Sequence, residues 1–193
     1  MTPPLKVSVI VPVLYGEPQL AQTLSSLAAL RDRLDVELLV VVDVPDPARE
    51  AEARGANDPP AAATGAVVVY RVGERGFGSA LRRGFAEASG DVVVPVMADV
   101  SDRFDDIPMM VSRMEEGFDV MAGSRYMRGG GTVGNTTKQR LSHLYSILMR
   151  WAGGPRIHDV SNAFKAYRRS AILAITSEAQ SFDVSVELAL KAH

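Results

Sequence analysis

Two carboxylates and a hydroxyl group follow an apolar, valine-rich run near the middle of the chain. They belong to Asp99, Ser101 and Asp102. Oxygen ligands suit Mg²⁺ or Mn²⁺, which keep waters and substrate phosphates in their coordination shell, so one or two carboxylates are enough for a site. Asp99 is the better ligand, because the preceding run is expected to form a strand that fixes it. The later carboxylates also suit the start of the next helix: Asp102, Asp105 and Asp106.

Basic side chains are concentrated in the C-terminal part of the chain. Residues 1–120 carry 11 basic and 19 acidic side chains, a balance of −8, whereas residues 121–193 carry 10 basic and 4 acidic ones, a balance of +6. Arginine forks match phosphate oxygens, so this asymmetry favours an anionic ligand handled by the second part, with solvated helix faces as the alternative. Arg125 is the candidate of most interest, because it directly follows an apolar run.

Other motifs that carry chemistry are absent or weak. The segment Gly76-Phe77-Gly78 superficially resembles a dinucleotide-binding loop, but Leu81 stands where the third glycine is needed. We interpret it as a tight turn that opens a helix. The histidines lack partners at metal-ligand spacing, and the absence of cysteine excludes disulfides, thiolate metal sites and cysteine nucleophiles.

The chain that must position these residues has 193 residues, of which 47% are apolar and 23% charged, which predicts one globular domain. No segment has the roughly 20 apolar residues of a membrane helix. A net charge of −2 does not suggest a nucleic-acid partner. The absence of cysteine agrees with a reducing cytosol, so we expect a cytoplasmic protein.

Short apolar runs alternate with helical patterns through residue 122. The predicted strands cover Val7–Val13, Glu37–Val42, Ala66–Val72, Asp91–Met97 and Asp119–Gly123. None alternates cleanly with polar residues, which is typical of a parallel sheet covered by helices on both faces, an α/β fold. Ligands bind at the carboxyl ends of such strands. The residues expected there are Pro12 to Glu17, Asp43, Ala98 to Asp102 and Gly123 to Arg125.

The remaining elements are read from apolar spacing and from glycine and proline. Helices or helical turns are predicted at residues 18–30, 48–55, 76–89, 141–151, 169–175 and 184–192, and a further helix is predicted to start at Asp105–Pro108. A further strand is predicted at 163–167, and loops at 57–64 and 128–137. No internal repeat and no interdomain linker is found.

The order of the motifs resembles the inverting family 2 glycosyltransferases of GT-A fold, most of all their dolichol-phosphate mannosyltransferase branch. The motifs are VSVIVPV, ELLVVVD, GFGSALRRGFAEASGDVVV, MADVSDRFDDIP, DVMAGSRYMRGGG and HDVSNAFKAYRRSAI. The resemblance runs from about residue 5 to the end. It implies a single GT-A-like domain over 1–193, with a nucleotide-binding half at 1–122 and an acceptor-side half at 123–193. The family continues beyond the position of His193, which leaves open a chain truncated at its C-terminus.

The resemblance also implies roles for the donor-side residues. Asp43 matches the contact to the nucleobase, and Asp99 matches the metal-binding member of an Asp-x-Asp motif whose first member is replaced by Met97. Gly16 stands where a glutamate is usual, and Glu17 follows one position later. We expect the donor nucleotide-sugar to contact Pro12, Glu17, Asp43, Lys165 and Arg168, and the metal to contact Asp99 and Ser101.

The implied reaction moves a sugar, with inversion, from a GDP- or UDP-sugar to an acceptor, with Mg²⁺ or Mn²⁺ as cofactor. A phosphate acceptor needs no general base, because its second pKa lies near about 6. The second half has many cations and one base candidate, Glu187, which alternatively orients a cation. We therefore expect a polyprenyl phosphate held by Arg125 and Arg140, with peripheral contact to the cytoplasmic face of a membrane. The residues expected to act in catalysis are Asp99, Arg125 and Glu187.

Two other readings stay open. Met97 and Gly16 favour a catalytically degenerate protein that binds a nucleotide-sugar or a partner without turnover. A sugar nucleotidyltransferase is disfavoured, because the segment VPVLYGEPQ lacks the glycine-rich loop with Arg and Lys that this class carries after its first strand.

Overall fold

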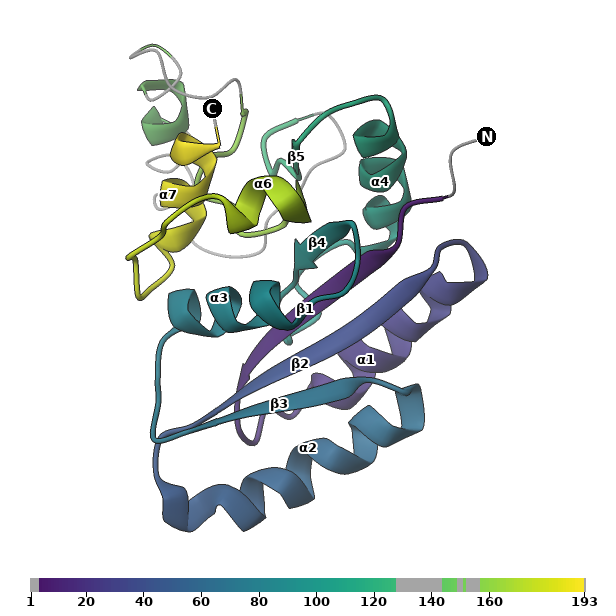
Figure 1. Ribbon diagram of the computed structural model, residues 1–193, viewed down its shortest axis with the longest axis vertical. Helices are drawn as coiled ribbons and strands as arrows, with labels where there is room; N and C mark the ends of the chain where they lie inside the picture. The colour runs from purple at the N-terminus through teal and green to yellow at the C-terminus, as the bar shows by residue number, and fades with distance from the viewer. Residues whose placement is uncertain (1–3, 128–143, 149–150, 152–156, 193) are drawn as a thin grey trace.

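The computed structural model describes residues 4–127, 144–148, 151 and 157–192. They form a six-stranded sheet flanked by helices (Figure 1). The strands are β1 (Val7–Leu14), β2 (Val36–Val44), β3 (Val67–Val72), β4 (Val92–Pro95), β5 (Val120–Ala122) and β6 (Lys165–Arg168). Their order is β3-β2-β1-β4-β6-β5. The first four pair in parallel, which confirms the predicted mainly parallel sheet, whereas β6 is antiparallel to β4 and β5.

The helices follow the predicted alternation. The α-helices are α1 (Leu20–Ala28), α2 (Glu50–Thr64), α3 (Phe77–Glu87), α4 (Ile107–Glu115), α6 (Arg169–Leu173) and α7 (Val184–Lys191). Short 3-10 turns are η1 (Ala29–Asp32), η2 (Pro47–Arg49) and η3 (Phe104–Asp106). Residues 144–148 and 151 of the predicted helix at 141–151 are helical. The predicted loop at 128–137 lies outside the described residues, and so does Arg140.

Strand side chains alternate between two apolar clusters, one on each face of the sheet. Val9 and Val40 pack with α1, α2 and α4 on one face. Ile10 and Val41 pack with α3, α6 and α7 on the other. Because both faces are buried, the strands appear in the sequence as unbroken apolar runs. In Figure 1, α1 and α2 lie together next to β2 and β3, and α6 lies next to α3.

Helix α2 differs from the prediction. The expected loop at 57–64 is wrong, because α2 runs through this segment and contains Pro59 and Pro60. Each proline inside a helix costs about 3 kcal/mol. Ala53 and Ala61 lie on one face of α2 and are buried in the cluster with α1 and β2. The helix therefore forms with its small-residue face packed in the core, against the local propensity.

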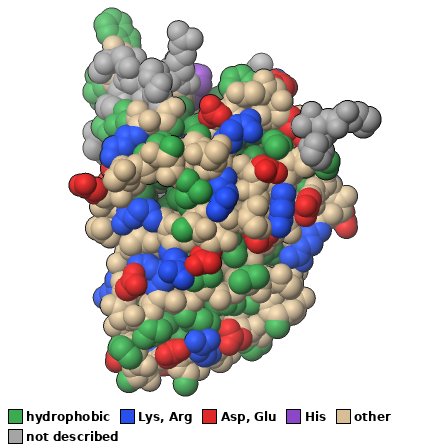
Figure 2. Space-filling view, in the orientation of Figure 1, with side chains coloured by type: hydrophobic (Ala, Val, Ile, Leu, Met, Phe, Trp, Pro, Cys, Tyr) green, Lys and Arg blue, Asp and Glu red, His purple; other side chains and the backbone are tan. Residues whose placement is uncertain are grey.

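The described surface is of mixed charge. Figure 2 shows acidic and basic side chains interspersed over one face of the molecule. Among the described residues, no helix is both long enough and apolar enough to cross a bilayer.

Candidate functional site

Asp43 lies near the end of β2, at the carboxyl edge of the parallel strands, as the sequence predicts. Its neighbour across the sheet, in β3, is Arg71. Arg71 Nη1 donates a hydrogen bond to Asp43 Oδ1 at 2.6 Å, and both side chains are buried. The edge therefore carries a buried carboxylate with a guanidinium beside it.

The same pair organises the turn between β3 and α3. The Gly76 amide donates to Asp43 Oδ2 at 2.9 Å, and Arg71 Nη2 donates to Ser79 Oγ at 2.7 Å. Gly76 has φ of +128°, which L side chains rarely adopt, so the glycine serves a tight turn that opens α3, as interpreted from the sequence. Burial raises the pKa of Asp43, although Arg71 and the Gly76 amide oppose this shift.

The segment after β1 reaches the same edge. The Tyr15 amide lies 3.5 Å from the carbonyl oxygen of Asp43. Glu17 Oε1 accepts a hydrogen bond from the Gln19 amide at 3.2 Å and so stabilises the approach to α1. Pro12 is buried within β1. The expected donor contacts Pro12 and Glu17 therefore lie at the correct edge, where both also shape the backbone.

Asp99 lies in an exposed turn that follows β4. Its Oδ1 accepts a hydrogen bond from the Ser101 amide at 3.1 Å. Thr23 Oγ1 donates to the carbonyl oxygen of Ala98 at 2.7 Å and so ties the turn to α1. The Asp99 carboxylate is thus held by the backbone and open to solvent.

Asp102 closes the same turn from its other end. Its Oδ2 accepts a hydrogen bond from the Met97 amide at 2.7 Å. Burial raises the pKa of Asp102 to about 6, although the Met97 amide opposes the shift and the Asp99 charge adds to it. Val100 has φ of +57°, which is unusual for a β-branched residue. The turn therefore holds a strained residue beside the exposed carboxylate.

Asp99 and Ser101 fit only part of a divalent cation site. Within the described residues, no group of three His, Cys, Asp or Glu side chains could hold a metal ion. An exposed carboxylate and a hydroxyl are hard oxygen ligands, whereas the thioether of Met97 is a poor ligand for a hard cation. These two oxygen ligands therefore fit Mg²⁺ or Mn²⁺ when a bound diphosphate supplies further oxygens.

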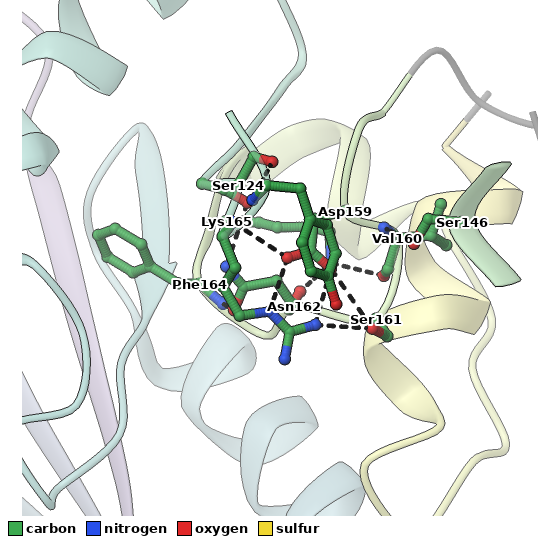
Figure 3. A network of polar contacts seen from close by, with 11 residues as sticks. Ser124, Ser146, Asp159, Val160, Ser161, Asn162, Phe164 and Lys165 are labelled. Carbon is green, nitrogen blue, oxygen red and sulfur yellow. Dashed lines mark hydrogen bonds and ion pairs between the residues drawn. The ribbon is translucent and has the colours of Figure 1, made fainter. Parts of the chain in front are cut away.

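Arg125 follows β5 at the same edge, but its guanidinium is already paired with Asp159 and Ser161, which Figure 3 labels within a network of polar contacts. Nε donates to Asp159 Oδ2 at 2.7 Å, and Nη2 donates to Asp159 Oδ1 at 2.8 Å and to Ser161 Oγ at 2.9 Å. The Asp159 side chain is fully buried, whereas that of Arg125 is 32% exposed. Burial alone raises the pKa of Asp159, but the Arg125 contacts lower it overall. The pair orients Arg125 while part of its side chain stays accessible.

Lys165 and Arg168 are placed differently from the prediction. Lys165 is fully buried, and its Nζ donates to the carbonyl oxygens of Val160 and Asn162. Because β6 is antiparallel, it ends at the opposite edge of the sheet, where Arg168 Nε pairs with Asp119 at 2.8 Å. These placements correct the expectation that both cations contact nucleotide phosphates, so we leave them out of the candidate site.

Glu187, the base candidate, lies in α7. Its carboxylate accepts from Lys191 Nζ at 2.7 Å, from Ser177 Oγ at 2.6 Å and from the Ala179 amide at 3.0 Å. These hydrogen bonds lower the pKa of Glu187 to about 2. An efficient general base has a pKa nearer the working pH, so the structure argues against that role.

The sequence does not single out Arg71 or Asp159. Parallel pairing offers a signal for Arg71, because neighbouring strands that end at one edge bring their last residues side by side. Asp159 lies within the motif HDVSNAFKAYRR, but no local pattern indicates that its partner is 34 residues earlier.

Comparison with protein families matches residues 8–175 to Glycosyl transferase family 2. The chain belongs to this family, which confirms the resemblance inferred from the motifs.

Two curated relatives illustrate the similarity. The chain is 29% identical over 191 residues to a dolichol-phosphate mannosyltransferase of Pyrococcus furiosus, an alignment that covers 97% of this chain and 53% of the relative. It is 30% identical over 172 residues to an undecaprenyl-phosphate 4-deoxy-4-formamido-L-arabinose transferase of Pseudomonas paraeruginosa, covering 88% and 49%. The chain thus spans about half the length of these relatives.

Solved structures agree on the fold. Glucosyl-3-phosphoglycerate synthase from Mycobacterium tuberculosis in complex with UDP superposes with a TM-score of 0.69 at 22% identity, covering 95% of this chain and 64% of that one. The same enzyme with Mg²⁺ and UDP gives a TM-score of 0.69 at 24% identity, covering 95% and 63%. The chain has the GT-A fold of these glycosyltransferases.

Proposed function

We propose that the protein transfers a sugar, with inversion, from a nucleotide-sugar donor to a polyprenyl phosphate. One observation carries this proposal: the buried carboxylate of Asp43, near the end of β2, and the exposed carboxylate of Asp99, in the turn after β4, lie at the same edge of the sheet, and each accepts a hydrogen bond from a backbone amide. The curated relatives that match most of this chain are polyprenyl-phosphate sugar transferases by name, which supports the acceptor class.

On the donor side, residues 1–122 bind the nucleotide. Asp43 accepts hydrogen bonds from the nucleobase, because each of its oxygens keeps acceptor capacity beyond its bond to Arg71 or Gly76. Asp99 and Ser101 hold Mg²⁺ or Mn²⁺. When bound, the cation neutralises charge on the diphosphate leaving group. A GDP- and a UDP-sugar are both compatible with these contacts.

On the acceptor side, residues 123–193 bind the lipid phosphate. The guanidinium of Arg125, held by Asp159, presents its accessible part to the phosphate, and Arg140 is the second cation. A phosphate monoester is mostly dianionic at neutral pH, so it attacks the sugar without a general base. Attack from the face opposite the diphosphate inverts the configuration of the sugar.

Contact with a membrane surface follows from such an acceptor. No acidic residue stands between Asp119 and Asp159, whereas six lysines or arginines do. Within this segment, Leu144, Leu148 and Trp151 are each more than half exposed. Apolar side chains beside cations suit the surface of an anionic bilayer, so we propose a peripheral location on the cytoplasmic face. Sedimentation with phosphatidylglycerol vesicles, but not with phosphatidylcholine vesicles, is the expected result.

The central test is the coupling between metal and nucleotide. Calorimetric titration with UDP and GDP should show tighter binding in Mn²⁺ than in EDTA for the wild type, and Asp99→Asn should abolish this difference with little loss of stability. Asp43→Asn should weaken binding under both conditions, by roughly 1.5–3 kcal/mol. Equal affinity in Mn²⁺ and EDTA for the wild type would remove the metal from the proposal.

The alternative is a degenerate protein without turnover, and Met97 is the observation that favours it. Met97 contributes its amide to Asp102 rather than a carboxylate to the metal. Release of nucleoside diphosphate from a nucleotide-sugar in the presence of polyprenyl phosphate separates the two candidates. Metal-coupled nucleotide binding without such release would favour the degenerate protein.

A further inference from the structure

The turn that joins α6 to α7, residues 176–182, packs against the first turn of α3. The Gly78 amide donates a hydrogen bond to the carbonyl oxygen of Gln180 at 3.0 Å. Arg82 Nη1 donates to the carbonyl oxygen of Ala179 at 2.6 Å. Two segments about 100 residues apart in the chain are thus joined by one backbone–backbone hydrogen bond and one side chain–backbone hydrogen bond.

Glycine is needed where the two segments meet. A Cβ atom at Gly78 would lie 2.1 Å from the carbonyl oxygen of Ala179, and one at Gly76 would lie 2.9 Å from that of Gln180. The rings of Phe77 and Phe182 stack beside this contact, with centroids 4.4 Å apart. The two glycines therefore serve the close approach of the 176–182 turn.

Glu187 holds this turn in shape from α7. Its Oε2 accepts hydrogen bonds from Ser177 Oγ and from the Ala179 amide, and its Oε1 accepts from the Glu178 amide at 3.2 Å and from Lys191. The carboxylate thus binds three consecutive residues of the turn. Its charge strengthens each of these hydrogen bonds.

The other side of the α3 turn contacts the candidate donor site. The Gly76 amide donates to Asp43, and Arg71 donates to both the Gly76 carbonyl oxygen and Ser79 Oγ. The segment Gly76–Ser79 therefore lies between the Asp43–Arg71 pair and the 176–182 turn. A chain of direct contacts thus links the 176–182 turn to the groups that hydrogen-bond to Asp43.

We propose that Glu187 is a positioning residue for donor binding. It fixes the 176–182 turn, the turn fixes Gly76–Ser79, and that segment orients the carboxylate of Asp43. The inference rests on the proposed function, because it takes Asp43 as the nucleobase contact. It assigns the C-terminal helix α7 to the donor site, although α7 lies in the part of the chain expected to serve the acceptor.

The first test compares Glu187→Ala and Glu187→Gln in the full chain. Amide exchange of Gly76–Ser79 should speed up about tenfold in Glu187→Ala, and the donor Kd should rise by a similar factor, with kcat changed less than about twofold. In Glu187→Gln, the amide exchange of Gly76–Ser79 and the donor Kd should both stay near their wild-type values, because the glutamine amide oxygen can still accept hydrogen bonds from Ser177 and Ala179. Glu178→Gln is the matched control: Glu178 is exposed, and no hydrogen bond of its side chain is seen among the described residues.

The second test approaches the contact from α3. Gly78→Ala should raise the donor Kd about as much as Glu187→Ala, because its Cβ displaces the turn. Gly55→Ala, in the exposed part of α2, is the control: a Cβ there meets nothing within 4 Å, so donor binding should not change.

Several results would overturn the inference. Unchanged exchange of Gly76–Ser79 in Glu187→Ala would show that the turn does not constrain α3, whatever the protein binds. A loss of kcat of about 100-fold or more in Glu187→Gln, at unchanged donor Kd, would make Glu187 a general base instead. If the wild type binds neither UDP nor GDP, that result alone refutes the proposed function, and the exchange data still decide whether Glu187 controls the α3 turn.

Discussion

Two aspartate–arginine pairs, each with a buried aspartate, lie at the carboxyl edge of the sheet, and they differ in how completely the aspartate is neutralised. Asp43 accepts from Arg71 and from one amide, and burial raises its pKa despite the guanidinium. Asp159 accepts from the amide, Nε and Nη2 of Arg125, with Lys165 nearby, and its pKa is lowered although burial opposes this.

The difference separates a carboxylate that can still bind a ligand from one that is engaged by the protein. Asp43 is only partly neutralised, so hydrogen bonds from a ligand would stabilise its charged form further. Asp159 is fully buried and already holds Arg125 in place, so its role is to orient that cation. Under the proposed function, Asp43 is the contact for the donor, and Asp159 orients Arg125 for the acceptor.

The largest effect is expected from a substitution that breaks the Asp43–Arg71 pair. Arg71→Met leaves the Asp43 carboxylate buried without its cation, and should lower the free energy of unfolding by about 3–5 kcal/mol. Arg125→Met should cost less, because the side chain of Arg125 is partly exposed to solvent. Urea unfolding measures both variants, with Arg83→Met as a control at an exposed i,i+4 pair, where the loss should stay below about 1 kcal/mol. A loss in Arg71→Met no larger than in the control would contradict the comparison.

A smaller effect distinguishes the two aspartates by pH. The folded-state pKa of Asp159 lies below its unfolded value of about 3.9, so its charge stabilises the fold above that pH and this contribution is lost as pH falls through the folded-state pKa. Asp159→Asn should therefore lower the free energy of unfolding by about 1.5–3 kcal/mol at pH 7, and by less near pH 3.5.

Asp43 provides the matched variant. Its raised pKa means that the folded state takes up a proton more readily than the unfolded state, so its charge stabilises nothing at pH 7. Asp43→Asn should cost less stability at pH 7 than Asp159→Asn. Urea unfolding at both pH values checks this, and a deficit in Asp159→Asn that does not depend on pH would count against the proposed difference.

The smallest effect on stability is expected from Lys165, the buried cation near the Arg125–Asp159 pair. Burial lowers its pKa to about 7, although Asp159 opposes the shift and Arg125 adds to it. The unfolded chain binds a proton at this lysine up to about pH 10.4, so between these values the free energy of unfolding should rise with pH by about 1.4 kcal/mol per unit. Lys165→Met should remove this contribution between pH 8 and 9. The same slope in wild type and variant would show that Lys165 is not shifted.

Strand positions and the edge that carries the candidate site could be predicted from the sequence. The apolar runs predicted strands of a parallel sheet, and Asp43 and Asp99 closely follow two of these runs, so both were expected at the carboxyl edge. The helical state of Pro59 and Pro60 in α2 could not be predicted from the sequence. It accompanies the burial of Ala53 and Ala61, which depends on neighbours from other segments of the chain.

The number and sign of the charges in the C-terminal part were also visible in the sequence, but their partners were not. Lys165 and Arg168 were expected to face phosphates, and the antiparallel β6 places one in the interior and the other at the opposite edge. Glu187 was expected to serve a ligand or a cation, and most of its hydrogen bonds go to the 176–182 turn.

The sequence by itself determined the family, through the order of its motifs. It also determined the mainly parallel sheet and the edge at which Asp43, Asp99 and Arg125 lie, because apolar runs and strand ends encode them. Only the tertiary structure decided which charges remain available to a ligand. Asp43 meets Arg71 28 residues later, and Arg125 meets Asp159 34 residues later. Such pairings depend on strand order and direction, which no local pattern specifies. They matter because a buried charge is costly unless it is paired, so the partners decide which charged groups can still contact a ligand.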